Sequence, residues 1–233
     1  MSAARGSGQL PLALRYPPDQ RFETWVEPRP VAAAALSALA RAPDAALYLL
    51  GAPGAGKTHL ALATCANAEA AGHACAYVAL DRVAGRVREA LDGLHGVALL
   101  ALDGLETVAG HRDDEVALFD LHNRMRDRGH GLLYTATVGP DALPLVLPDL
   151  RSRLAQCARL ALAPLDDAGR AQMLRLRAQR RGLQVDDAAI DWLLRRVDRD
   201  PQHLAGLFER LDAAALAAQR GITVPFLREV LGP

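Results

Sequence analysis

Residues 51–58, which read Gly-Ala-Pro-Gly-Ala-Gly-Lys-Thr, decide the fold of this chain. The stretch matches the phosphate-loop pattern of Gly, any four residues, Gly-Lys and Ser or Thr, and it stands between an apolar run and a helical pattern. Its glycines let backbone N–H groups close around a β-phosphate, Lys57 is expected to bridge β- and γ-oxygens, and Thr58 is expected to ligate Mg²⁺. The motif predicts a site for ADP or ATP with Mg²⁺, lined by Gly51, Pro53, Gly54, Ala55, Gly56, Lys57, Thr58 and His59.

The rest of the chain predicts an α/β domain followed by a small helical one. Five short apolar runs alternate with helical patterns, which favours a five-stranded, largely parallel sheet with helices on both faces, and only helical patterns follow Leu165. We expect a flexible arm over 1–21, a nucleotide-binding α/β domain over 22–164 and an all-helical lid domain over 165–233. The predicted strands are 45–50, 74–80, 96–102, 131–136 and 158–162, and the predicted helices between them are 57–71, 82–93, 112–128 and 147–155.

Composition predicts a cytoplasmic globular protein. The 27 basic residues balance 27 acidic ones, which argues against the broad cationic surface of a DNA-coating protein, and no apolar run reaches the ~18 residues of a membrane span. Cys65, Cys75 and Cys157 lie far apart without histidines at ligand spacing, so we expect packing thiols rather than a zinc site or disulfides. Lys57 is the only lysine, which favours a position that needs a compact ammonium.

An acidic residue at the end of the third predicted strand completes the candidate site. The run Leu99-Leu100-Ala101-Leu102 delivers Asp103 to the carboxyl edge of the sheet, where it is expected to hold the water shell of the metal. The next residue is Gly104, whereas a member of the large ATPase class that hydrolyses its nucleotide usually carries a second acidic residue at this position to orient water. Glu106 follows two positions later, and we expect it to point elsewhere as the chain leaves the strand.

Five longer stretches carry further motifs. They are Phe22-Glu23-Thr24-Trp25-Val26, Gly56-Lys57-Thr58-His59-Leu60, Phe119-Asp120-Leu121-His122-Asn123, Leu147-Pro148-Asp149-Leu150-Arg151-Ser152-Arg153-Leu154 and Ile222-Thr223-Val224-Pro225-Phe226. Together these stretches resemble the AAA+ class and, within it, the family of the replication initiator DnaA and its regulatory inactivator Hda. The resemblance spans about 22–231, and its 147–154 and 222–226 patterns are more specific than the phosphate loop.

The resemblance implies a role for Arg153 as an arginine finger that reaches a nucleotide held by a neighbouring subunit. Arg151, two residues earlier, is expected to be solvated. Where the initiator has a sensor Asp this chain has Thr137, and the lid arginine of the initiator aligns with Gln202. Together with Gly104, these departures predict a chain that holds nucleotide and hydrolyses its own ATP weakly, and the resemblance implies that the nucleotide is ADP.

The resemblance also implies two partners. Gln9, Leu10, Leu12 and Leu14 resemble the short motif by which inactivators dock on the sliding clamp, the β subunit of DNA polymerase III, and an extended peptide of this kind suits a polar notch beside an apolar groove. The second partner is DnaA, whose bound ATP would be hydrolysed. Because nothing basic follows the lid, we expect the inactivator rather than the initiator. We expect neither sequence-specific DNA binding nor membrane contact. The sequence leaves open whether the chain forms a homo-oligomer.

Two other functions remain as alternatives. A helicase loader or transposition helper ATPase would carry a basic DNA-contacting face and no clamp peptide. A metabolic kinase built on the phosphate loop would need its own catalytic acid and an acceptor pocket, and neither is visible in the sequence.

Overall fold

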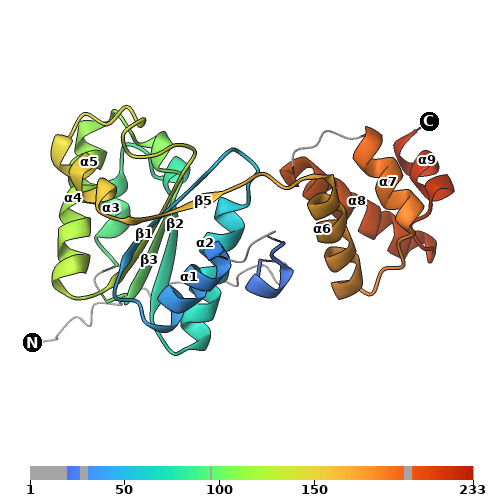
Figure 1. Ribbon diagram of the computed structural model, residues 1–233, viewed down its shortest axis with the longest axis horizontal. Coiled ribbons are helices and arrows are strands. Elements are labelled where there is room, and N and C mark those ends of the chain that lie inside the picture. The colour runs from blue at the N-terminus through green and yellow to red at the C-terminus, as the bar shows by residue number, and fades with distance from the viewer. Residues whose placement is uncertain (1–19, 27–30, 95, 197–200, 233) are drawn as a thin grey trace, which may run out of the picture.

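The computed structural model describes residues 20–26, 31–94, 96–196 and 201–232. Figure 1 shows two parts, an α/β part that contains every strand and a purely helical part, joined by the chain that leaves β5. The predicted fold class is therefore confirmed. In the described ranges, no helix is long and apolar enough to cross a membrane.

The sheet has the strand order β2-β3-β4-β1-β5, and every neighbouring pair is parallel. Each strand lies within about three residues of an apolar run singled out in the sequence. β4 is buried along its whole length because helices cover both faces, which is why its sequence lacks polar alternation. The strands are β1 (Ala46–Gly51), β2 (Cys75–Ala79), β3 (Leu99–Asp103), β4 (Gly131–Ala136) and β5 (Ala158–Leu162).

Helices cover the two faces of the sheet separately (Figure 1). α1 (Val31–Arg41) and α2 (Lys57–Ala70) pack on the face that includes Leu49 and Leu133. The opposite face, which includes Tyr48, carries α3 (Val87–Leu91), α4 (Arg112–Asp127) and α5 (Pro148–Ala155). Alternate residues of one strand thus serve two separate cores, as the period of a strand requires.

One predicted helix is much shorter in the structure. The pattern over 82–93 predicted a single helix, but the chain forms the 3-10 turn η2 (Leu80–Arg82) and then the five-residue α3. Gly85 lies between them with φ of +78°, a left-handed conformation that ends a right-handed helix. The glycine therefore divides the segment.

The helical part has its own core. Apolar side chains of all four helices form one buried cluster, which includes Leu174, Ile190, Leu211 and Phe226. The Asp166 carboxylate caps the first of these helices, because it accepts the Gly169 N–H at 2.7 Å. The helices are α6 (Asp167–Arg180), α7 (Asp187–Arg196), α8 (Pro201–Ala218) and α9 (Val224–Leu231).

Candidate nucleotide-binding site

The phosphate loop connects β1, an inner strand of the sheet, to α2. Gly51 ends β1 and Lys57 begins α2, so the N-terminus of the helix, with its unsatisfied N–H groups, faces the loop. Gly54 and Gly56 take φ of +75° and +89°, which only glycine adopts without strain. The Lys57 ammonium donates to the carbonyl oxygens of Gly51 at 2.7 Å and Ala52 at 3.1 Å. These backbone contacts hold the lysine beside the loop, from which it can reach a phosphate.

Burial lowers the pKa of Lys57, and the carboxylates of Glu106 and Asp103 act in the opposite direction. The Glu106 carboxylate accepts the N–H of Thr137 at 3.3 Å, and its charge acts on Lys57 as well. The expectation that Glu106 points away from the site therefore stays a prediction. Gly104 adopts φ of +86°, and the 3-10 turn η3 (Leu105–Thr107) follows immediately after β3. The chain turns back at once and keeps this side chain near the end of β4.

Asp103 lies where the sequence placed it, at the end of β3, and three hydroxyl groups donate to its carboxylate. Thr58 donates to Oδ2 at 2.7 Å, Tyr77 donates to the same oxygen at 2.7 Å, and Thr135 donates to Oδ1. Burial, followed by the charge of Asp103, raises the pKa of Tyr77 well above its usual value, so the phenol stays a donor. The predicted pair of Thr58 and Asp103 is thus in direct contact.

The β3–β4 register explains why Thr135 rather than Thr137 contacts Asp103. Leu102 pairs with Tyr134, so the next residues of the two parallel strands, Asp103 and Thr135, are neighbours. Thr135 also accepts the Gly104 N–H at 2.9 Å. The hydroxyl therefore fixes both the carboxylate and the turn that follows it.

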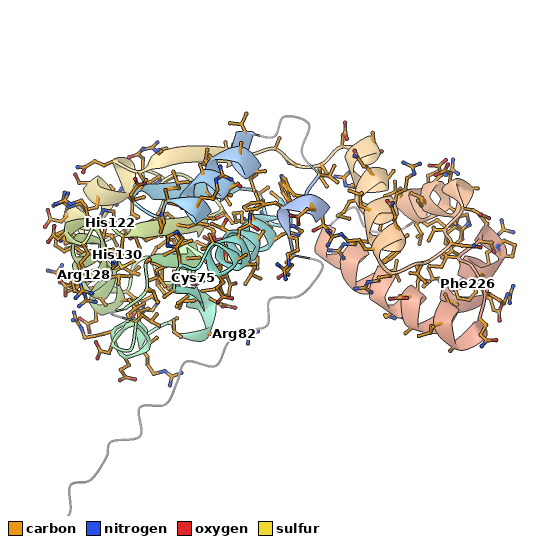
Figure 2. The ribbon with its side chains drawn as sticks, turned by 90° about the horizontal axis from the view of Figure 1, so that it is seen from below. Cys75, Arg82, His122, Arg128, His130 and Phe226 are labelled. Carbon is orange, nitrogen blue, oxygen red and sulfur yellow. The ribbon has the colours of Figure 1, made fainter. Side chains whose placement is uncertain are left out.

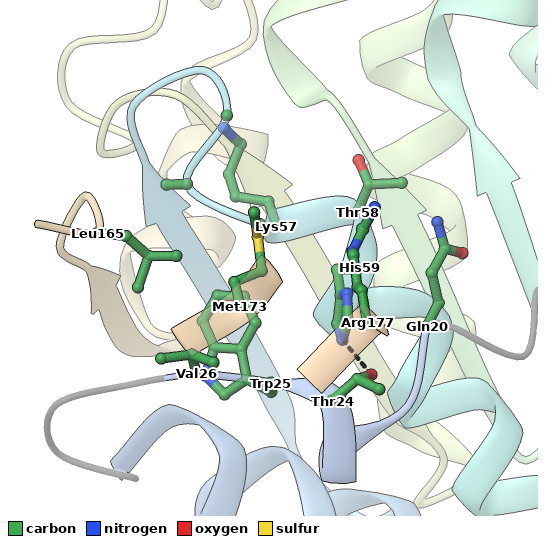
Figure 3. A pocket seen from close by; sticks show the side chains of 13 residues that line it. Gln20, Thr24, Trp25, Val26, Lys57, Thr58, His59, Leu165, Met173 and Arg177 are labelled. Carbon is green, nitrogen blue, oxygen red and sulfur yellow. Dashed lines mark hydrogen bonds between the residues drawn. The ribbon is translucent and has the colours of Figure 1, made fainter. Parts of the chain in front are cut away.

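A pocket of about 270 Å³ extends from the phosphate loop toward the helical part. Figure 3 shows Lys57 and Thr58 toward one end and Trp25 with Val26 toward the other. The far end is thus mostly apolar and aromatic, which suits the flat ring of a base, while the near end carries the cation and hydroxyl that suit phosphate and metal. The pocket is lined by Gln20, Thr24, Trp25, Val26, Gly54, Ala55, Gly56, Lys57, Thr58, His59, Leu165, Met173 and Arg177.

Trp25 is a residue of this pocket whose role the sequence alone does not reveal. Its ring covers Gly56 so closely that a Cβ on this glycine would lie 2.2 Å from Trp25 Cζ3. The ring also lies 5.5 Å from that of His59, whose Nε2 is 2.9 Å from the Arg21 carbonyl oxygen. His59 therefore fastens the segment before α1 to the start of α2. The motif around Trp25 is visible in the sequence, but its position over the loop depends on tertiary packing.

The helical part adds side chains that no motif indicated. Met173 and Arg177 of α6 line the pocket, so a cation reaches it from the lid although the residue aligned with the lid arginine of the initiator is Gln202. Gln202 lies within α8, and its side chain is outside the described residues. The docking motif Gln9, Leu10, Leu12 and Leu14 also lies outside them.

Arg153 is not part of this pocket. It is a half-buried residue of α5, and together with Arg126 it lowers the pKa of the buried His122, for which burial is the larger cause. Figure 2 shows His122 at the end of the α/β part remote from Phe226 of the helical part. The structure therefore separates Arg153 from the nucleotide pocket of its own chain.

Arg151 and Arg153 differ in their contacts. Arg151 donates to the carbonyl oxygen of Leu145 at 2.6 Å and to that of Asp141 at 3.4 Å, so the expectation that it is solvated was wrong. It lies one turn into α5, facing back over the loop that enters the helix. For the Arg153 guanidinium, no hydrogen bond or ion pair is found with the described residues.

Comparison with known proteins gives two family matches. Residues 167–231 match the family model of the Hda lid domain, and residues 18–121 match that of the IstB-like ATP-binding proteins. Domain III of the Thermotoga maritima replication initiation protein DnaA superposes with a TM-score of 0.80 at 19% identity, covering 94% of this chain and 99% of that one. The chain is an AAA+ protein related to Hda and DnaA. Its helical part is thus a lid of the Hda type.

Other solved structures share the fold of this Hda- and DnaA-related AAA+ protein. AMPPCP-bound DnaA from Aquifex aeolicus superposes with a TM-score of 0.70 at 19% identity, covering 92% of this chain and 69% of that one. The Holliday junction branch migration motor RuvB of Thermotoga maritima gives 0.66 at 18% identity, covering 93% and 72%. At such low identity, the structural likeness establishes the AAA+ fold alone.

Proposed function

We propose that this AAA+ protein restrains replication initiation by stimulating hydrolysis of the ATP bound to DnaA. Arg153 acts in trans as the arginine finger. The observation that carries the proposal is the position of Arg153 on α5, outside its own pocket and without an ion pair to the described residues; Figure 1 shows α5 at the end of the α/β part remote from the helical part. A guanidinium in that position is available to stabilise charge on a phosphoryl group held by a neighbour, an effect worth about 10³ to 10⁵ in rate.

The chain's own nucleotide serves a structural role in this proposal. ADP or ATP is held by the phosphate loop and Lys57, and the contact of Thr58 with Asp103 fits a magnesium site, with the hydroxyl as ligand and the carboxylate on the water shell. Bound Mg²⁺ would neutralise phosphate charge. Hydrolysis of this nucleotide is slow because Gly104 supplies no acid beside Asp103, while Glu106 already accepts the N–H of Thr137.

Docking on the sliding clamp is the second element of the proposal. A short motif of one glutamine and three leucines precedes the AAA+ domain in the sequence, formed by Gln9, Leu10, Leu12 and Leu14. Such a peptide binds through one polar anchor and a few leucines in an apolar groove. The clamp would thus raise the local concentration of the inactivator near DnaA, so stimulation should depend on clamp loaded on DNA.

The test measures hydrolysis of ATP already bound to DnaA, with and without clamp loaded on DNA. We expect clamp-dependent hydrolysis with the wild-type chain and a loss of at least about 10³-fold of the stimulation with Arg153→Ala. Arg126→Ala is the matched control, because Arg126 is an exposed arginine that acts on the same buried histidine. Stimulation that persists in the Arg153 variant, or falls equally in both variants, would refute the finger.

A second function is favoured by the match of residues 18–121 to the IstB-like ATP-binding proteins. A helper ATPase of this type would hydrolyse its own ATP and respond to duplex DNA. Steady-state hydrolysis by the isolated chain, with and without DNA, separates the two functions. Rapid, DNA-stimulated turnover would favour the helper, whereas slow turnover indifferent to DNA is expected of the inactivator.

A further inference from the structure

A fully buried carboxylate connects α4 to the start of the helix that carries Arg153. Glu115 lies in the first turn of α4 and has no exposed surface. Its Oε2 accepts the N–H of Leu147 at 2.7 Å and that of Val146 at 3.0 Å, and Oε1 accepts the N–H of Gly110 at 2.7 Å. One side chain thus holds two segments, the end of the loop after β3 and the entry into α5.

The nature of these contacts makes them strong. In the described part of the chain, every hydrogen bond to the Glu115 carboxylate comes from backbone N–H, and such charge-assisted bonds are roughly twice as strong as neutral ones. Leu147 is the N-cap residue of α5, and its apolar side chain offers no cap. Glu115 therefore fixes, from a neighbouring helix, a helix start that its own sequence leaves without a cap.

We propose that Glu115 is a positioning residue for Arg153. The inference rests on the proposed finger function. Arg153 is the sixth residue of α5, about 9 Å along the axis from Leu147 at ~1.5 Å per residue, and a helix this short moves as one body. A displacement of about 1 Å at Leu147 is therefore passed on to the guanidinium. Misplacement by about 1 Å can reduce a rate by about 10²-fold.

The chain contains a matched control for the stability effect of removing such a carboxylate. Asp114, the preceding residue, is 3% exposed and also accepts two backbone N–H groups, those of Gly85 at 2.6 Å and Val87 at 3.1 Å. These groups belong to the start of α3 rather than α5. Loss of Asp114 thus leaves buried donors without an acceptor, as loss of Glu115 does, but at a helix that carries no finger.

The experiment compares Glu115→Ala with Asp114→Ala as stimulators of the hydrolysis of DnaA-bound ATP, in the presence of clamp loaded on DNA. Both variants are expected to unfold at a lower temperature. Glu115→Ala should reduce the saturating stimulated rate by about 10- to 100-fold, with the half-saturating concentration and ADP affinity within about threefold of wild type. Asp114→Ala should keep that rate within about threefold. Equal loss in both variants, or an unchanged rate in Glu115→Ala, would overturn the proposal.

Two further variants keep the test interpretable. Glu115→Gln keeps one acceptor oxygen and replaces the alanine variant if that variant fails to fold. We expect its saturating stimulated rate to lie between those of the wild type and of Glu115→Ala. A rate equal to that of the wild type would refute the positioning role. Arg153→Ala tests the proposed function itself. If stimulation survives loss of Arg153, the finger is wrong, whereas full loss in Arg153→Ala beside wild-type stimulation in Glu115→Ala refutes only the positioning role.

Discussion

Replacement of Gly56 by alanine is predicted to destabilise the chain through two separable effects. The first is backbone strain, because Gly56 has φ of +89°, a conformation that costs an L-residue about 1 to 2 kcal/mol. The second is a clash, because the new Cβ would lie 2.2 Å from Cζ3 and 2.6 Å from Cη2 of Trp25. Neither atom belongs to a flexible chain end, so the whole indole must move.

The size of each effect follows from the structure. Forcing an extra carbon into a packed site costs about 1 to 3 kcal/mol, so Gly56→Ala should lower the free energy of unfolding by about 2 to 5 kcal/mol in total. Gly72→Ala is the control for strain alone, because Gly72 has φ of +85° and nothing lies within 4 Å of the position that a Cβ would take there. That variant should lose only about 1 to 2 kcal/mol.

A double-mutant cycle with Trp25→Ala isolates the clash. In the Trp25→Ala background the indole is absent, so Gly56→Ala should cost no more than Gly72→Ala, which gives a coupling of about 1 to 3 kcal/mol. Urea unfolding measures stability, and titration with a fluorescent ADP analogue measures the pocket. If Gly56→Ala costs the same with and without the indole, to within ~0.5 kcal/mol, the packing of Trp25 over the loop is refuted.

Two further predictions concern polar side chains of the α/β part. Asp103→Asn should lower nucleotide affinity by about 10-fold or more in Mg²⁺ and leave it nearly unchanged in EDTA, which titration in both buffers checks; an equal loss in EDTA would remove Asp103 from the metal site. Acid should destabilise the chain, because burial and the charges of Arg153 and Arg126 lower the pKa of His122 to about 4, so the unfolded chain binds more protons below pH 6.5. Between pH 6.5 and 4 the free energy of unfolding, measured with urea, should fall by about 3 kcal/mol. In His122→Asn the free energy of unfolding should depend less on pH over this range. If its pH dependence matched that of the wild type, His122 would not be the group responsible.

The strands and the loop could be read from the sequence because their signals are local. A strand buried on both faces has a continuous apolar sequence, as β4 shows. The phosphate loop has glycines at Gly54 and Gly56 because its backbone takes positive φ values there. Local signals failed where a glycine redirects the chain. Gly85 shortened a predicted helix, and Gly104 is followed by a turn that brings Glu106 to the end of β4. Neither φ value can be deduced from neighbouring side chains.

The end of the pocket remote from the phosphate loop was not predictable for a different reason. Trp25, Met173 and Arg177 come from segments on either side of the sheet sequence, and they meet only when the lid is placed against the α/β part. Thr135 illustrates the same point within the sheet, because its contact with Asp103 depends on strand register. Motifs therefore locate the phosphate end of such a site, whereas packing between distant segments makes the other end.

The separation of Lys57 from Arg153 constrains what a finger on this chain can do. Arg153 lies outside the pocket of its own chain, so the finger that we propose would act on a nucleotide held by another subunit. Glu115 and Arg151 hold the entry of α5 through a buried carboxylate and two backbone carbonyls, which indicates that the position of this helix is tightly specified. A helix whose arginine served only solubility would gain nothing from such anchoring, because a solvated charge needs no fixed direction. The anchoring of α5 and the place of Arg153 outside the pocket therefore both support the proposed function, in which Arg153 acts on a nucleotide held by a neighbour.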